Sequence, residues 1–226
     1  GRRHVSVEGV VVKKERFSVV KVKICGVTNV EDALHAADTG ADMLGFNFYE
    51  KSPRYLEPLA ARAIVSKLPD RIEKVGVFVN MGGSRIAEFI DLIGLTAVQL
   101  HGDEDERFVD DLRRLADVAV IKAVRVDDTF QAGSFCKFRV DAVLLDTYSA
   151  GQYGGTGDSF NWNSAIEAKA FAPAIYLAGG LTPENVADAI RTVRPHVVDT
   201  ASGVESSPGK KDSKKVADFI RIAKNA

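Results

Sequence analysis

The chain has 226 residues, of which 46% are hydrophobic and 27% are charged, and its net charge at pH 7 is −1. This composition is typical of a single folded domain and excludes a disordered chain, and no apolar run approaches the roughly 20 residues of a membrane span. The balanced charge gives no indication of nucleic-acid binding. Cys25 and Cys136 cannot form a disulfide framework and lack the spacing of zinc ligands, so we expect no metal site and a reducing, cytoplasmic location.

Short apolar runs rich in β-branched residues alternate with helical patterns along the chain. Near-continuous apolar runs are typical of strands that are covered on both faces, as in a parallel sheet. The predicted strands are residues 20–25, 43–48, 74–79, 97–100, 120–124, 142–146, 174–178 and 197–200.

Helix signals fill the intervals between these strands. Thr28 to Glu31 has the form of a capping box, and Gly40 is suited to end that helix. Apolar residues recur at helical spacing between residues 86 and 93, and the acidic run 103–106 precedes another such pattern.

Three further helices complete the alternation. Thr182 followed by Pro183 predicts a helix start, and apolar residues between 216 and 220 mark the last helix. The weakest pattern is 127–138, where Gly133 interrupts the helical spacing; we expect Cys136, in this segment, to be a small packing residue.

Eight strands, each followed by a helix, are the sequence form of a closed (β/α)8 barrel (a TIM barrel) in a single domain. An open doubly wound sheet is the competing arrangement, but eight repeats in about 200 residues favour closure. We assign 20–226 to the barrel and 1–19 to an N-terminal extension of unknown role, which could be a tag, a processed remnant, a linker or a strand that caps the barrel floor.

The chemistry of such a barrel lies at the C-terminal ends of its strands. Cys25 ends the first strand, where a thiolate could take a proton from carbon; the alternative is a small buried hydrophobic residue. Asp146 ends the sixth strand, where burial would keep a proton on it as a general acid requires; the alternative is a cap on the following turn.

Further polar residues follow the second and fourth strands. Gln99 and His101 share a face by the strand period of two, so both could meet a ligand in the barrel mouth or serve as structural hydrogen-bonding groups. Arg54 could pair with a carboxylate or phosphate, or lie free in solvent.

Glycine-bearing segments follow the last three strands, at 154–157, 178–183 and 202–205. Barrel enzymes often bind phosphate with the loops after strands 7 and 8, where backbone N–H groups and a helix N-terminus face the anion. The dinucleotide and nucleoside-triphosphate motifs GxGxxG and GxxxxGK[ST] are absent from the sequence. The residues therefore indicate a cofactor-free enzyme for a small phosphorylated substrate, and one cysteine with one aspartate favours isomerisation over redox chemistry or hydrolysis.

Several blocks occur in an order that resembles one family. Lys23–Gly26, Gln99–Gly102, Leu145–Asp146, Gly154–Gly157, Leu177–Leu181 and Ser202–Glu205 are similar to the corresponding blocks of the phosphoribosylanthranilate isomerases of tryptophan biosynthesis. The resemblance covers residues 20–226. It implies an Amadori rearrangement of N-(5′-phosphoribosyl)anthranilate to 1-(2-carboxyphenylamino)-1-deoxyribulose 5-phosphate, with one acid, one base and no cofactor.

The resemblance also implies roles for individual residues. Asp146 matches the family's general acid, Cys25 its general base, and Arg54 the arginine that receives the anthranilate carboxylate. Asp199 matches an aspartate near the substrate's amino and hydroxyl groups, and Gln99 and His101 are expected to line the site. The phosphate-binding residues implied are Gly179, Gly180, Ser202 and Gly203.

The sequence departs from the family pattern at Ala201, where a serine is expected, so a hydroxyl is lost beside the phosphate loop. Fusion or association with a neighbouring enzyme of the pathway is a further expectation. Two alternatives stay open. One is another phosphorylated-sugar barrel enzyme. An indoleglycerol-phosphate synthase is supported weakly, by Lys122 alone, and a phosphoribosyl-formimino isomerase needs paired aspartates at the ends of strands 1 and 5, which this sequence lacks. The other is a non-catalytic phosphate-binding module.

Overall fold

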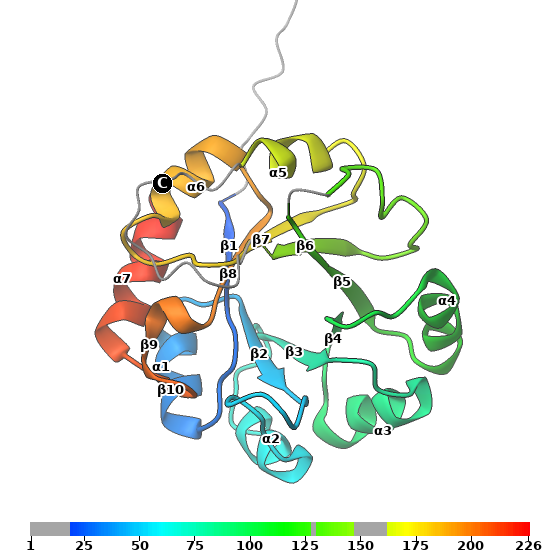
Figure 1. The fold of residues 1–226 in the computed structure, drawn as a ribbon. Helices are drawn as coiled ribbons and strands as arrows, with labels where there is room; N and C mark the ends of the chain where they lie inside the picture. The colour runs from blue at the N-terminus through cyan, green and yellow to red at the C-terminus, as the bar shows by residue number, and fades with distance from the viewer. Residues whose placement is uncertain (1–18, 128–129, 147–161) are drawn as a thin grey trace, which may run out of the picture.

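The computed structural model describes residues 19–127, 130–146 and 162–226. Eight parallel strands close into a barrel in the order β1 to β8, and helices surround it (Figure 1). The strands are β1 Lys21–Ile24, β2 Met43–Asn47, β3 Glu73–Phe78, β4 Ala97–Leu100, β5 Ala119–Arg125, β6 Ala142–Asp146, β7 Ile175–Ala178 and β8 Val197–Thr200. The predicted closed barrel is thus confirmed, and each predicted strand lies within two residues of the observed one at either end.

The outer layer consists of α-helices and one 3₁₀ helix. They are α1 Val30–Thr39, α2 Pro58–Val65, α3 Gly83–Ile93, α4 Glu106–Leu115, α5 Asn163–Ala168, α6 Val186–Val193, η1 Ser202–Val204 and α7 Ser213–Lys224. A small hairpin of β9 (Glu205–Ser207) and β10 (Lys210–Lys211) lies between η1 and α7. Among the described residues, no helix is long and apolar enough to cross a bilayer.

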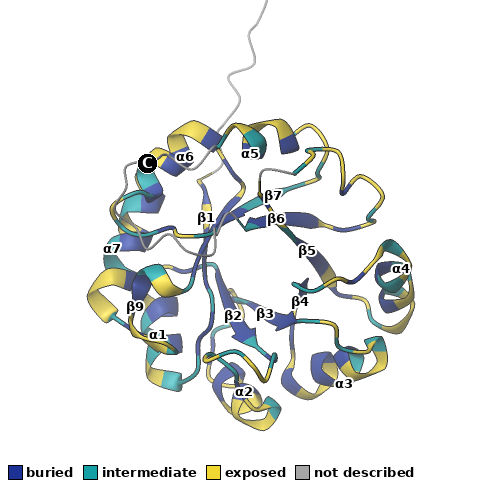
Figure 2. Cartoon of the chain, in the orientation of Figure 1, coloured by how far each residue is buried: buried dark blue, intermediate teal, exposed yellow. Residues whose placement is uncertain are grey.

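Apolar residues form two packed regions, which the alternation of side chains along each strand separates. One lies between the strands and the helices, whose inward faces are buried while their outer faces are exposed (Figure 2). The other fills the barrel interior, with Met43, Val75, Ile121, Leu144 and Val197 among its members. Alternate side chains of each strand therefore point into the barrel, and the polar ones among them near the C-terminal ends of the strands face the barrel mouth.

The segment after β5 differs from the prediction. The helix predicted at 127–138 is wrong for its described part: residues 132–137 form turns, and Ser134, Cys136 and Phe138 each donate a backbone hydrogen bond to the carbonyl of the residue three positions before. Phe135 is buried and stacks on Phe130, which holds these turns against the barrel without a helix. Cys136 is exposed and is not the buried packing residue that the sequence suggested.

Two helix starts also differ from the prediction. Asn29, not Thr28, caps α1: its side chain accepts from the Asp32 backbone N–H, while the Thr28 hydroxyl donates to the Gly209 carbonyl. The helix predicted to begin at Pro183, after an N-cap at Thr182, begins three residues later, at Val186. The Asn185 side chain accepts from the Thr182 N–H and so closes a separate turn before the helix. Gly40 ends α1 as predicted.

Candidate active site

Lys23, Cys25 and Asp199 form a buried polar group where β1 meets β8. Lys23 and Asp199 are register partners on the two strands, and Lys23 Nζ lies 3.1 Å from Asp199 Oδ1. The Lys23 side chain is fully buried, and it also reaches the thiol of Cys25, two residues along the same face of the chain. Gly45 on β2 makes room for this group, since a Cβ there would lie 2.7 Å from Cys25 Sγ and 3.1 Å from Lys23 Nζ.

Burial and neighbouring charges together set the ionisation of this group. Burial raises the pKa of the Cys25 thiol above its ordinary value of 9.0, and the neighbouring Lys23 ammonium opposes this shift without cancelling it. Burial alone would lower the pKa of Lys23, but Asp199 and Cys25 outweigh it, and the net pKa is raised. The free protein therefore holds a protonated thiol beside a charged ammonium.

A second group lies across the barrel, at the ends of β4 and β6. Gln99 Nε2 lies 2.8 Å from His101 Nδ1, and His101 Nε2 lies 3.3 Å from Asp146 Oδ2. The side chains of His101 and Asp146 are about one-third exposed, whereas Gln99 is buried, so Asp146 lacks the burial that we expected from the sequence to keep a proton on it. The Gln99 Oε1 atom is buried with no hydrogen-bond partner in the described part of the chain. The sequence placed these three residues at one mouth, and the structure joins them in a chain that ends on Asp146.

Arg54, in the loop between β2 and α2, is not free in solvent. Its Nε and Nη2 atoms donate to the two carboxylate oxygens of Glu205 at 2.8 and 2.7 Å, a bidentate pair. Lys211 Nζ lies 3.0 Å from Glu205 Oε1 and also donates to the backbone carbonyl of Cys25. This cluster therefore abuts the Cys25 side of the barrel mouth.

The loops after β7 and β8 are joined by backbone contacts. Gly179 and Gly180 have φ angles of 84° and 65°, which favour glycine. The Thr200 hydroxyl donates to the Leu181 carbonyl at 2.7 Å, and Gly203 passes so close to this carbonyl that a Cβ would overlap its oxygen. The two predicted phosphate loops are thus neighbours, with Ser202 in η1, whereas the predicted glycine segment 154–157 lies outside the described residues.

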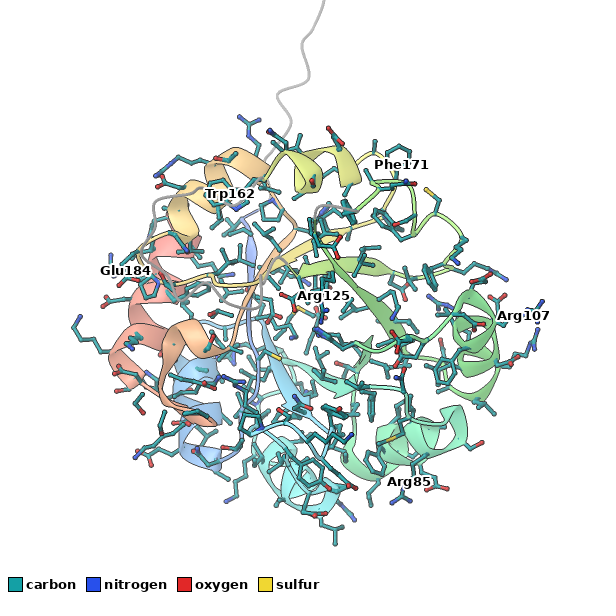
Figure 3. All side chains as sticks on the ribbon, in the orientation of Figure 1. Arg85, Arg107, Arg125, Trp162, Phe171 and Glu184 are labelled. Atoms are coloured by element: carbon teal, nitrogen blue, oxygen red, sulfur yellow. The ribbon has the colours of Figure 1, made fainter. Side chains whose placement is uncertain are left out.

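Sequence reasoning missed four charged residues. Lys23 and Glu205 stand inside the quoted blocks but were assigned no role, although Lys23 shares the face of Cys25 by the strand period of two. Lys211 lies outside the quoted blocks. Arg125, the register partner of Asp146, lies near the centre of the barrel in the axial view of Figure 3, and its guanidinium makes no hydrogen bond or ion pair within the described residues.

Lys122 does not face the barrel mouth. It stands between Ile121 and Ala123, which both pack inside the barrel, so its side chain points outward. There Nζ lies 2.9 Å from Glu104 Oε2 and also donates to the Gly102 carbonyl. A lysine held in this way is not available to a substrate, which removes the one residue that supported the synthase alternative.

Among the described residues no cluster of three His, Cys, Asp or Glu side chains could hold a metal ion.

Comparison with known proteins agrees with this geometry. Residues 22–222 match the model of the N-(5′-phosphoribosyl)anthranilate (PRA) isomerase family. The N-(5′-phosphoribosyl)anthranilate isomerase of Geobacter sulfurreducens is 50% identical over 206 residues, which are 91% of this chain and 99% of that protein. The chain belongs to the PRA isomerase family. It is therefore an enzyme of the isomerase class, in a family of tryptophan biosynthesis.

Solved structures of the same family share the fold. Phosphoribosyl anthranilate isomerase from Thermotoga maritima superposes with a TM-score of 0.83 at 43% identity, over 92% of this chain and all of that one. A second structure, at 41% identity and a TM-score of 0.81 with the same coverage, holds reduced 1-(o-carboxyphenylamino)-1-deoxyribulose 5-phosphate.

Proposed function

We propose that this member of the PRA isomerase family rearranges N-(5′-phosphoribosyl)anthranilate to 1-(2-carboxyphenylamino)-1-deoxyribulose 5-phosphate, with Asp146 as general acid and Cys25 as general base. The observation that carries the proposal is the placement of two proton-transfer groups at the mouth of the barrel, Asp146 at the end of β6 and Cys25 just after β1. β1 and β6 are separated by two strands on one side and four on the other, so a substrate in the mouth meets the two groups from different directions.

The reaction needs one proton donated and one removed. The furanose ring oxygen takes a proton from the acid as the C1′–O bond breaks, and the nitrogen lone pair forms an iminium. The base then removes the C2′ proton, and the C2′–H electrons form an enolamine. Tautomerisation to the ketone returns a proton to C1′. No electrons enter or leave the substrate.

Asp146 must carry a proton to act as the acid. The Gln99–His101 pair offers two arrangements, because the two ends of an amide are assigned from its hydrogen bonds. If Gln99 donates to Nδ1, the ring carries its proton on Nε2 and donates to an ionised Asp146. If the amide turns by half a rotation, its oxygen accepts from Nδ1–H and Nε2 accepts from a protonated Asp146. The acid role of Asp146 requires the second arrangement.

Cys25 acts as the base in its thiolate form. Because burial raises the pKa of this thiol, the thiolate is a minor form near neutral pH but a strong base when it forms. The Lys23 ammonium stabilises that thiolate. The C2′ proton moves to Sγ.

Substrate contacts follow from the remaining residues. Arg54 receives the anthranilate carboxylate, and Asp199 faces the amino and hydroxyl groups while it pairs with Lys23 through Oδ1. Gly179, Gly180, Ser202 and Gly203 bind the phosphate through backbone N–H groups. Ala201 offers no hydroxyl, so the backbone has the larger share of this binding.

A fluorescence assay tests the proposal. The preceding transferase produces the substrate in place from anthranilate and phosphoribosyl pyrophosphate, and the next enzyme removes the product. The expected result is a loss of substrate fluorescence at a rate proportional to the concentration of this protein, with the deoxyribulose product identified by mass. No loss from folded protein would contradict the proposal.

We also propose a cytoplasmic setting on chemical grounds. Cys25 and Cys136 are both free, which suits a reducing compartment such as the cytoplasm. Association or fusion with a neighbouring enzyme of the pathway stays a prediction.

A further inference from the structure

We propose that Glu205 is a positioning residue for Arg54, which it holds so that one edge of the guanidinium stays open for the carboxylate of the substrate. The inference rests on the role proposed for Arg54 above. A guanidinium can bind a carboxylate through Nε with one terminal nitrogen, or through its two terminal nitrogens. Glu205 takes the first edge, with Nε at 2.8 Å and Nη2 at 2.7 Å, and Nη1 makes no hydrogen bond within the described residues.

Glu205 is itself held firmly. Its side chain is 5% exposed, and its Oε1 atom accepts from Lys211 Nζ at 3.0 Å and from the Gly209 backbone N–H at 3.3 Å. Burial alone would raise the pKa of Glu205, but Arg54 and Lys211 outweigh burial and lower it, so the carboxylate stays ionised. A fixed and charged partner restrains Arg54 more than a solvent-exposed one could.

The restraint matters because Arg54 comes from a loop. An arginine side chain that becomes fixed on binding loses up to about 2 kcal/mol of rotamer entropy, which corresponds to an affinity ratio of about 30-fold. Glu205 removes this loss before the substrate arrives. The effect belongs to the carboxylate contact and not to proton transfer, so it alters KM and leaves kcat nearly unchanged.

Two other roles for Glu205 predict different behaviour. A purely structural role, in which Glu205 holds the β9–β10 hairpin through Lys211, would affect every ligand equally. A competing role, in which Glu205 occupies the position of the substrate carboxylate, would make its removal lower KM.

The test compares two substrates in Glu205→Gln, which keeps the shape and removes the charge. One is N-(5′-phosphoribosyl)anthranilate; the other is N-(5′-phosphoribosyl)aniline, which lacks only the carboxylate. We expect KM for the first to rise by about 10- to 30-fold with kcat within a few-fold. KM for the second should change by less than threefold, and the effect on the first should vanish in an Arg54→Ala background.

Glu104→Gln is the matched control. Glu104 is as buried as Glu205 and pairs with Lys122 at 2.9 Å, but it does not contact Arg54. Its substitution should change KM for the two substrates by the same factor. Circular dichroism reports whether each variant folds. If Glu205→Gln does not fold, Glu205→Asp takes its place: it keeps the charge beside Lys211 but is too short for the bidentate pair with Arg54, and should show the same selective rise in KM.

The outcomes separate this inference from the proposed function. An equal change in KM for both substrates, or a lower KM for the anthranilate substrate, would overturn the positioning role. If wild type turns over both substrates and Arg54→Ala changes KM for both by the same factor, Arg54 does not bind the carboxylate. The positioning role of Glu205 is then wrong as well, and Arg125→Gln is the next variant to test for the carboxylate contact. If wild type turns over neither, the proposed function fails.

Discussion

Gly203→Ala should disrupt the close backbone contact between the loops after β7 and β8. The added Cβ would overlap the Leu181 carbonyl oxygen and lie 2.9 Å from both the Leu181 carbonyl carbon and Thr200 Oγ1. These atoms cannot move aside as the end of a flexible side chain can, because the Thr200 hydroxyl donates to that same carbonyl. The backbone of one loop must therefore shift.

The magnitude follows from the cost of overpacking. Inserting a methyl group into a filled site costs about 1–3 kcal/mol, and each kcal/mol lowers Tm by about 2–4 °C in a domain of this size. The shift also moves backbone N–H groups of the loops that we propose to bind the phosphate. Loss of one hydrogen bond to a charged group costs about 1.5–3 kcal/mol, so KM should rise by about 10- to 100-fold.

The assay measures Tm by calorimetry and KM by substrate fluorescence in Gly203→Ala and in a control, Gly133→Ala. Gly133 lies in the turns after β5, its φ is not positive, and a Cβ there would lie 3.9 Å from its nearest neighbour, an ordinary contact. The control should keep KM and have an equal or slightly higher Tm. Gly203→Ala with wild-type Tm and KM would refute the packing argument.

Two further predictions concern the buried group at β1 and β8. In a Cys136→Ser background, the rate of Cys25 alkylation by iodoacetamide should rise with pH through a midpoint above 9.0, because burial favours the protonated thiol. A midpoint at or below 9.0 would contradict this. Lys23→Met should lower the free energy of unfolding in urea by about 3–5 kcal/mol, because it leaves Asp199 buried without its partner. Adding Asp199→Asn should recover part of the loss, and a loss below about 1 kcal/mol would show that the pair is solvated.

The barrel could be predicted from the sequence because its strands carry a strong local signal. Four-to-six-residue apolar runs such as Ala142–Asp146 have one interpretation in an alternating chain, and they were located to within two residues. Helix starts were less predictable, because Thr28 and Asn29 are both good N-caps. The Thr28 hydroxyl donates to the carbonyl of Gly209, almost two hundred residues away in the sequence, and Asn29 is left to cap α1.

The partners of the site residues could not be read from the sequence. The strand period indicates that Lys23 and Cys25 share a face, but not that Asp199 of β8 is their neighbour. Arg54 and Glu205 are 151 positions apart, so their bidentate pair depends on how the hairpin after β8 folds back. The ionisation of Cys25 depends on burial and on Lys23 together, and it follows only from the packed structure.

The most direct test of the acid–base account is the turnover of Asp146→Asn. The amide keeps the shape of the side chain but has no acidic proton, and general acid catalysis contributes about 10²–10⁴-fold. We predict that kcat falls by that factor while reduced 1-(o-carboxyphenylamino)-1-deoxyribulose 5-phosphate still binds, and that Asp188→Asn on the exposed face of α6 keeps the wild-type kcat. A kcat of Asp146→Asn close to that of wild type would contradict the account.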